Sequence, residues 1–507
     1  MLWPVRSFRG GISDEASRGI AGSFQFGYGL DIHKRRDSLS AKQAMATVLD
    51  ASTGVLGGAH VGTTLTAPFL WFVPASDGTT YCFGATGSIF SFSGDGRWTF
   101  VHNDENGRIG GAAEFELSDG ADYLWWATAT AISRKALNGV DITPDSGTAR
   151  WTDATIAYKT ENVFSNEWHP MAVTSGALHT GNRQALAQVD FDGDFDPGVL
   201  NIRPGNKIKA IEERDDYTIL GSYREDETEQ GHIWSWLITA QNWVQKKLKP
   251  VKGVNALITT EQNLLQGGNA GEIFPADFAN SIPLAEIEGG GEVFPGGVTI
   301  EDDLALFGFF GGTYPGIWSY GRRNKNRSNA LNYEYRLAKT VGGSTISTIG
   351  AIMNINGIVY ASWGTTDEST SEYGVDAVSS TTKVTAVYRS LEFDGQIPHA
   401  VKKFNAVKLT MTPLPTGCGV SLCYRKERND TETFSEGFDA GDGFIYATVG
   451  GGTDTTFSAV GETEVMFQIG DTANLFELEI ELTPFSNETA EINSVTTYIN
   501  DESYEYA

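Results

Sequence analysis

The chain has little cysteine, little proline and few basic residues for its length. Its 507 residues include 3 Cys, 16 Pro and 37 Lys and Arg, against 64 Asp and Glu. Cys82 stands alone, while Cys418 and Cys423 lie five apart in a strand-like run, which places their side chains on opposite sides of a sheet. This spacing matches neither a Cys-x-x-Cys metal pair nor an easily formed disulfide. We therefore expect no structural zinc, and folding in a reducing cytoplasm.

Long apolar runs are also missing. No segment approaches the ~20 unbroken apolar residues of a membrane helix, and the opening MLWPVRSFRGGISDE lacks the apolar stretch of a secretory signal. Residues 429–507 contain no Lys or Arg but hold 17 Asp and Glu, in a chain of net charge −27. Because duplex binding depends on Lys and Arg that displace counterions, this acidic end argues against sequence-specific nucleic-acid binding.

Motifs for nucleophilic or metal-dependent catalysis do not occur. There is no Gly-x-Ser-x-Gly elbow, and the seven histidines show no His-Glu-x-x-His spacing. The triple glycines at 289–291 and 450–452 lack the lysine and the strand-to-helix context of a phosphate-binding loop. These observations favour a protein that is not an enzyme and needs no cofactor.

Glycine and aromatic residues are abundant. The 59 Gly and an aromatic content of 11% are typical of short strands joined by tight turns. Between about 43 and 385, aromatic strands such as IWSW and IWSY recur every ~40 to 55 residues, which is the period of a four-stranded propeller blade. The sequence thus predicts an all-β fold with a β-propeller of about seven blades. A short helix is expected within SLSAKQAMATVLD, residues 38–50, and another within PADFANSI.

The two ends of the chain have a different texture. Residues 1–42 are glycine-rich and locally basic, and they are interpreted either as an arm that contacts a neighbour or as a strand that closes the first domain. Residues 386–507 contain longer strands with strict alternation. In LFELEIEL, Leu478, Ile480 and Leu482 should point inward, and Glu477, Glu479 and Glu481 outward. This pattern predicts an acidic C-terminal β-sandwich after the propeller.

An alternating aspartate run, QVDFDGDFDPGVL, is the main candidate site. Asp190, Asp192, Asp194 and Asp196 fall on every second position, so on a strand they would share one face. They are interpreted as a solvated acidic turn or as a Ca²⁺ site that matches the EF-hand spacing only in part. A pair of glycosidase carboxylates, with Asp192 and Asp194 as the candidates, is the third reading.

Two further groups of residues invite functional interpretations. Exposed tryptophans stack on sugars, so Trp125, Trp126, Trp234, Trp236 and Trp243 are candidates for glycan contact, with core packing the favoured alternative. The basic run YGRRNKNRSN, residues 320–329, is read as a phosphate or acidic-partner contact, or as a solvated loop tip. That set comprises Arg322, Arg323, Lys325 and Arg327.

Three stretches together resemble a known class of proteins. They are SFRGGISDEASRGIAGSFQFGYGLDI, the blade texture of residues 43–385, and VYRSLEFDGQIPHAVKKFNAVKLTMTPLPTGCGVSLCYRKE. In texture they resemble the β-propeller structural proteins of tailed-bacteriophage virions, such as tail hub, nozzle or packaged-DNA stabilisation proteins. The resemblance implies a homo-oligomeric ring made in the bacterial host cytoplasm, docked to other tail proteins in the virion and in passive contact with translocating DNA. The alternatives are a receptor- or glycan-binding module at the tail tip and, third, a glycan-cleaving enzyme.

Overall fold

The computed structural model divides into two compact units. It describes residues 2–13, 22–33, 38–50, 65–92, 98–104, 107–128, 132–137, 168–224, 230–249, 253–261, 264–279, 282–287, 289–323, 328–341, 345–366, 371–393, 400–426 and 444–501. The propeller unit comprises Ala46–Gly316 and Leu337–Ala377. The terminal unit comprises Met1–Met45, Ile317–Arg336 and Val378–Ala507.

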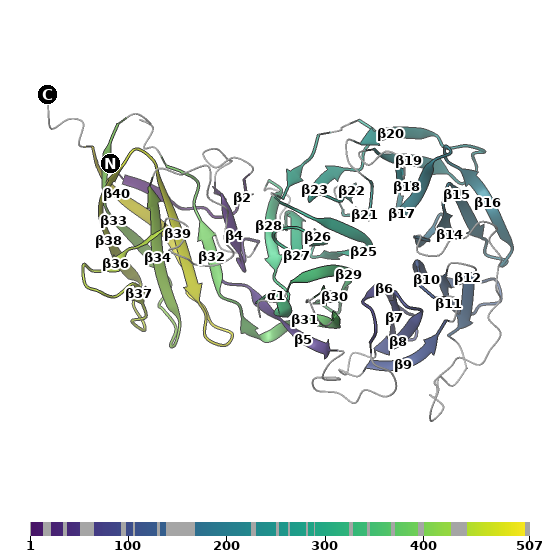
Figure 1. Cartoon of the computed structure of the whole chain (residues 1–507), viewed down its shortest axis with the longest axis horizontal. Coiled ribbons are helices and arrows are strands. Elements are labelled where there is room, and N and C mark those ends of the chain that lie inside the picture. The colour runs from purple at the N-terminus through teal and green to yellow at the C-terminus, as the bar shows by residue number, and fades with distance from the viewer. Residues whose placement is uncertain are drawn as a thin grey trace. The chain divides into compact units, whose positions relative to one another are not determined.

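Seven antiparallel sheets, numbered one to seven here in chain order, make up the propeller unit over its described residues. Figure 1 shows them arranged as a ring of blades. The strands, sheet by sheet, are β6 (Phe69–Pro74), β7 (Thr80–Gly84), β8 (Ser88–Phe92), β9 (Trp98–Asn103); β10 (Gly111–Glu116), β11 (Asp122–Ala127), β12 (Ile132–Ala136); β13 (Met171–Thr174), β14 (Ala177–Asn182), β15 (Ala185–Val189), β16 (Phe195–Asn201); β17 (Asn206–Arg214), β18 (Tyr217–Arg224), β19 (Gly231–Leu237), β20 (Gln245–Lys249); β21 (Ala256–Thr259), β22 (Leu264–Gly267), β23 (Glu272–Pro275), β24 (Ala285–Glu286); β25 (Glu292–Glu301), β26 (Leu304–Phe310); and β29 (Ile346–Ile355), β30 (Ile358–Thr366), β31 (Ser371–Lys383), β5 (Gln43–Asp50). The prediction of a propeller of about seven blades is confirmed.

Strand β5 closes the ring. It comes from the N-terminal side of the chain and pairs with β31, so it completes sheet seven, whose other strands lie about three hundred residues later. Leu49 of β5 is buried in one core with Phe69 and Trp98 of sheet one and Val375 of sheet seven. The helix expected within residues 38–50 is therefore wrong: the β-branched Thr47 and Val48 suit a strand, and pairing with β31 outweighs local helix propensity.

Tight hairpins separate the strands, as the turn residues indicate. Ser175 and Gly176 both have positive φ (49° and 76°) between β13 and β14, and Asn356 and Gly357 do the same (52° and 82°) between β29 and β30. Two-residue hairpins favour turns with two such residues because these turns match the strand twist. Among the described residues the only helix is α1 (Ala338–Val341), so the helix expected in PADFANSI is not found in its described part. No described helix is long and apolar enough for a membrane span.

Over its described residues, the terminal unit holds two larger sheets and the small parallel sheet β2-β3. The first sheet has the order β1-β40-β33-β38-β36, and the second includes β28-β4-β32-β39-β34-β35. The strands of this unit are β1 (Leu2–Val5), β2 (Gly11–Ile12), β3 (Ser23–Phe24), β4 (Phe26–Tyr28), β27 (Gly316–Gly321), β28 (Ala330–Tyr335), β32 (Ala386–Arg389), β33 (Lys402–Met411), β34 (Gly419–Lys426), β35 (Ile445–Tyr446), β36 (Thr448–Val449), β37 (Thr456–Phe457), β38 (Glu464–Ala473), β39 (Phe476–Thr483) and β40 (Ile492–Asp501).

One hydrophobic core joins these two sheets. Phe404 of β33 stacks on Phe476 of β39, with ring centroids 4.1 Å apart, and Val407 and Ile480 are fully buried beside them. This is the face-to-face packing that alternating strands favour. The C-terminal sandwich stays a prediction as a fold assignment.

The alternation in LFELEIEL orients the side chains as expected, but the outward glutamates do not face water. Glu477 and Glu479 are only 2% and 0% exposed, and they pair with Arg425 and Arg389 on the neighbouring strands. Both guanidinium groups lie 4.7 Å from the centroid of the Phe444 ring. Buried carboxylates need such partners, so this face of the sheet is a second, charged layer of the unit.

The N-terminal segment belongs to the terminal unit. β1 pairs with β40, with Leu2 opposite Tyr498, and β4 pairs with β32. Residues 1–45 and 317–336 join residues 378–507 in this compact unit, and the expected domains at 1–42, 43–385 and 386–507 stay a prediction. The reason is strand pairing between residues far apart in the sequence, which the local sequence pattern does not predict.

Candidate functional site

The aspartate run forms the hairpin turn between β15 and β16. The Gly193 amide donates to the Asp190 carbonyl (3.0 Å), and the Asp194 amide donates to Asp190 Oδ1 (2.8 Å). Gly193 has a φ of 86°, which a glycine adopts without strain. The side chain of Asp196 accepts from the Gly198 amide (2.9 Å). Two of the four carboxylates thus shape the turn.

The structure brings no metal-binding cluster together at this turn. Among the described residues, which include Asp190, Asp192, Asp194 and Asp196, there is no group of three or more His, Cys, Asp or Glu side chains placed to hold a metal ion. Asp192, Asp194 and Asp196 are exposed on the hairpin. The geometry favours the solvated-turn interpretation, while Ca²⁺ binding stays a prediction that a chelator experiment tests.

The tryptophans singled out in the sequence pack inside the blades. Trp125, Trp126, Trp234 and Trp236 are at most 2% exposed, and Trp243 packs edge-on against Trp234. The Trp126 indole donates to Asp104 Oδ2 (2.7 Å), and that of Trp234 donates to Ser222 Oγ (2.9 Å). The core interpretation is confirmed for these four side chains, so they offer no surface for sugars.

The basic run and the cysteines do not form a functional site over the described residues. Of the basic run 320–329, Lys325 and Arg327 lie outside the described residues, and Arg322 and Arg323 fall in the terminal unit. The three cysteines are free and buried, and burial raises the pKa of the Cys82 and Cys423 thiols. A buried, protonated thiol is a poor nucleophile, so none of them is a reactive group in this fold.

A cluster that the sequence did not reveal lies between the inner strands of the propeller. Figure 1 shows β17, β21 and β25 on the inside of the ring. Lys209 Nζ of β17 lies 2.7 Å from Glu292 Oε1 of β25, and Asn255, just before β21, donates to the same oxygen (3.0 Å). One carboxylate therefore links sheets four, five and six. We call these residues, with the aromatic residues and the arginine described next, the axial cluster.

Aromatic rings complete the axial cluster. Trp168, just before β13, packs edge-on against Phe294 of β25, with centroids 4.8 Å apart. The Arg108 guanidinium stacks over the Trp168 ring at 4.2 Å, and Lys209 Nζ lies 5.7 Å from the same ring. Sheets three and six thus meet through side chains. The aromatic faces and Glu292 offset the cost of placing two cations close together.

Burial controls the electrostatics of the axial cluster. It lowers the pKa of Lys209, and the nearby Arg108 acts in the same direction, while Glu292 acts against them. Burial is also the main cause that lowers the pKa of Arg108. The charged form of Lys209 therefore depends on Glu292. The axial cluster is suited to a structural role, in which it holds neighbouring blades together. Its single described carboxylate is already bound by a lysine and an amide.

Glycines let the inner strands approach one another at backbone distance. A Cβ on Gly296 of β25 would lie 2.0 Å from the Leu70 carbonyl oxygen of β6, and one on Gly350 of β29 would lie 2.0 Å from that of Phe69. Such contacts admit no side chain. Sheets one, six and seven are thus packed tightly, and glycines inside strand patterns are the signal of it in the sequence.

Exposed apolar side chains gather at the outer edges of sheets four and five. Val244 and Leu248 at β20 are 48% and 45% exposed, and Ile282 and Leu284, before β24, are 76% and 40% exposed. Lys247 Nζ donates to the Ala279 carbonyl (3.2 Å), so the two edges are in contact. We call Val244, Leu248, Ile282 and Leu284 the blade 4–5 rim. Exposed apolar side chains of this kind are candidates for an interaction site.

The blade 4–5 rim has a basic border. Burial, followed by the charges of Arg203 and Arg224, lowers the pKa of Lys246, which shows that three cations lie close together. Lys246 Nζ also lies 4.8 Å from the centroid of the Trp234 ring.

The solved structures that resemble this chain include β-propellers, with low sequence identity and low TM-scores. No model of a known protein family matches the chain, and no curated protein matches it. Similar solved structures include the WD40 β-propeller domain of Doa1 (TM-score 0.43, 11% identity, covering 67% of this chain and 97% of that chain) and the WD40 repeats of RRP9 (0.44, 10%, 67% and 99%). YCF48 bound to D1 peptide is another (0.40, 9%, 63% and 93%). At these values no function transfers, and the propeller assignment rests on the sheet order and the closure by β5.

Proposed function

We propose that this protein is a non-enzymatic structural component that works by docking to other proteins, and specifically a multicopy tail hub, adaptor or nozzle-type protein of a tailed-phage virion. A closed propeller suits this role, because it presents a rigid rim and two faces with few free sheet edges. The virion assignment extends the sequence resemblance. It places the protein in the tail after synthesis in the host cytoplasm.

The blade 4–5 rim is the observation that carries the docking proposal. Four apolar side chains, each at least 40% exposed, stand on the edges of two neighbouring sheets, and Lys246, which the charges of Arg203 and Arg224 reach, lies on β20 between Val244 and Leu248. An apolar centre with a charged border is the composition of a protein interface. We assign a second copy of this chain as the occupant.

The complementary surface lies on the terminal unit. Val460 and Phe485 are 58% and 60% exposed, and the exposed Glu462 and Glu488 lie beside them. The Gly461 amide donates to the Leu414 carbonyl (2.9 Å), and a Cβ on Gly417 would approach the Phe485 ring to 2.7 Å, so the turn from Leu414 to Gly417 joins the two parts. We call Val460, Glu462, Phe485 and Glu488 the acidic end patch.

The two surfaces differ, and this determines the type of assembly. A contact between the basic blade 4–5 rim of one copy and the acidic end patch of the next is heterologous. Such contacts form rings when the rotation between copies closes. Opposite charges also direct the approach of the two surfaces and disfavour contacts between like patches.

The docking proposal is tested by the mass of the protein in solution. We expect the purified protein to form oligomers in sedimentation-velocity or mass-photometry experiments, and the double variant L248D/I282D to be monomeric. Ile358→Asp places one such charge at a 39% exposed apolar residue in the β29–β30 hairpin and should leave the oligomer intact. A monomeric wild-type protein at micromolar concentration would contradict self-docking.

The virion assignment needs its own test. Mass spectrometry of purified particles from the phage that encodes the chain should detect it in a constant ratio to the portal protein. Its absence from intact particles would contradict the tail role, whereas the docking proposal would still depend only on the solution experiment.

A further inference from the structure

A pocket lies on the first sheet of the terminal unit, on the face away from the core. Three strands form it: Asn405 and Ala406 come from β33, Met466 and Gln468 from β38, and Tyr498 from β40. Ile499 and Asn500, also on β40, complete the lining. Its volume of about 450 Å³ lies within the ~300–1,000 Å³ typical of small-molecule sites.

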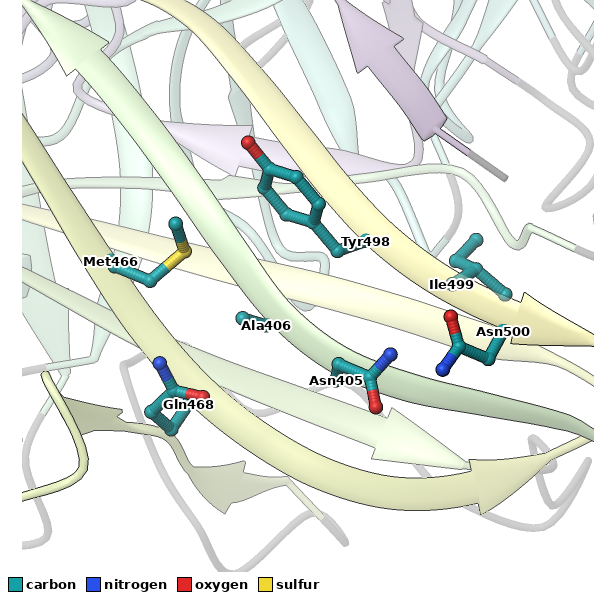
Figure 2. Close-up of a pocket in the computed structure, with 7 residues that line it drawn as sticks. All are labelled: Asn405, Ala406, Met466, Gln468, Tyr498, Ile499 and Asn500. Atoms are coloured by element: carbon teal, nitrogen blue, oxygen red, sulfur yellow. The ribbon is translucent and has the colours of Figure 1, made fainter.

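A β-bulge in the central strand shapes this pocket. Phe404 pairs with Ile499 and Ala406 with Tyr498, so Asn405 is an extra residue in β33, and the pairing with β38 shifts at the same place. Bulges re-aim side chains. Figure 2 shows the Asn405 and Asn500 amides turned toward each other, with Tyr498 and Met466 on either side of the small Ala406.

The lining combines amides with an aromatic ring. Asn405, Gln468 and Asn500 each carry a donor and an acceptor on one planar group, which matches neighbouring hydroxyls that also donate and accept. Tyr498 and Met466 supply apolar surface for C–H groups. None of the seven lining side chains carries a charge at neutral pH. A ligand for this site is therefore neutral, rich in hydroxyls and amphipathic.

We infer that this pocket binds a neutral hexopyranose unit of an oligosaccharide. A pyranose ring has an apolar C–H face, which packs on the Tyr498 ring, and equatorial hydroxyls, which the three amides hold. Ala406 leaves the space that the ring occupies between Tyr498 and Met466. The pocket is open on an exposed sheet face, so a longer chain can extend beyond the bound unit. The inference goes beyond the docking function and uses none of its residues.

The experiment measures binding of defined oligosaccharides to the full-length protein by isothermal titration calorimetry. The probes are cellohexaose, maltohexaose and hexa-N-acetylchitohexaose, with polygalacturonate as an anionic comparison. We expect at least one neutral probe to bind with millimolar or better affinity and polygalacturonate not to bind. Tyr498→Ala should weaken binding about tenfold, because one ring contact is lost. Gln468→Ala should weaken it about fivefold, since one hydrogen-bonding group is lost.

Two further variants separate binding from folding. Ala406→Leu keeps every amide and the tyrosine but fills the pocket, so it should abolish binding while the melting temperature stays near that of the wild type. Asn201→Ala removes an exposed amide from β16 of the propeller unit and should bind like the wild type. Failure of all neutral probes, binding restricted to polygalacturonate, or unchanged binding by Ala406→Leu would overturn the inference. None of these results bears on the oligomer measurement that tests docking.

Discussion

Lys209 Nζ lies 2.7 Å from Glu292 Oε1, although 83 residues separate them and they belong to the inner strands of sheets four and six. Asn255, just before β21 of sheet five, donates to the same carboxylate. The lysine side chain is 9% exposed and the glutamate side chain 35%. The ion pair therefore joins three blades near the centre of the ring, where its partial burial makes it stronger than a surface pair.

Removal of the Glu292 charge should destabilise the propeller unit. Glu292→Gln leaves Lys209 buried without its anion, and we expect a loss of about 1–3 kcal/mol in the free energy of unfolding, measured by urea titration. The double variant K209M/E292L replaces the pair with apolar groups and should recover most of that loss. Equal stability of Glu292→Gln and the wild type would show that the pair does not link the blades.

Ring closure by β5 should be visible in the variant Leu49→Ala. Leu49 is 2% exposed in the core shared by sheets one and seven, so its truncation leaves a cavity there and costs about 2–5 kcal/mol. Hydrogen exchange should rise first in amides of β5, β31 and β6, and later in sheets three to five. Uniform hydrogen exchange of the amides across all the blades would indicate that β5 does not close the ring.

Acidification should weaken the fold through buried neutral histidines. Burial lowers the pKa of His179 to about 4 from its ordinary 6.5; its ring bonds Thr174 Oγ1 (2.7 Å) and Gln188 Oε1 (3.2 Å). Because the unfolded chain binds the proton more tightly, stability is fully present above pH 6.5 and is lost as pH falls toward 4. His33 and His232, whose pKa values burial lowers to about 3 and about 4, act with the same sign.

The variant His179→Asn isolates one of these contributions. It cannot titrate, so the slope of unfolding free energy against pH between 6.5 and 4 should be smaller than in the wild type, by at most about 1.4 kcal/mol per pH unit. Urea titrations at several pH values measure the slope. An unchanged slope would mean that His179 takes up its proton equally in the folded and unfolded states.

The aspartate hairpin should behave as a turn. Asp190→Ala removes the acceptor of the Asp194 amide and should cost about 1 kcal/mol. Addition of a chelator to the wild type should leave the melting temperature unchanged, because a ligand stabilises only if it binds the native state. A fall in melting temperature on chelation, reversed by added Ca²⁺, would support the metal interpretation of Asp190, Asp192, Asp194 and Asp196.

Features that depend on residues close together in the chain could be predicted from the sequence. Alternation in LFELEIEL oriented the side chains of β39 correctly, and turn residues such as Asn356-Gly357 sit at tight hairpins as their φ preference requires. The recurring aromatic strands identified the blades, because each blade buries large side chains such as Trp234 against its neighbour.

Features that depend on distant pairing could not be read from the sequence. Nothing near Gln43–Asp50 indicates that this strand completes a sheet formed three hundred residues later, and local propensity suggested a helix instead. Lys209 and Glu292 look like ordinary surface charges until the ring places them together. The pocket arises from a register shift at Asn405, which no composition or motif marks.

Disulfide trapping tests the head-to-tail docking of copies most directly. The three native cysteines are buried, so cysteines introduced at exposed residues react selectively. When Leu248→Cys and Val460→Cys proteins are mixed and oxidised, we expect a cross-linked dimer that contains one chain of each, and little dimer from either variant alone. No cross-link in the mixture, or equal cross-linking of each variant with itself, would contradict docking of the blade 4–5 rim onto the acidic end patch.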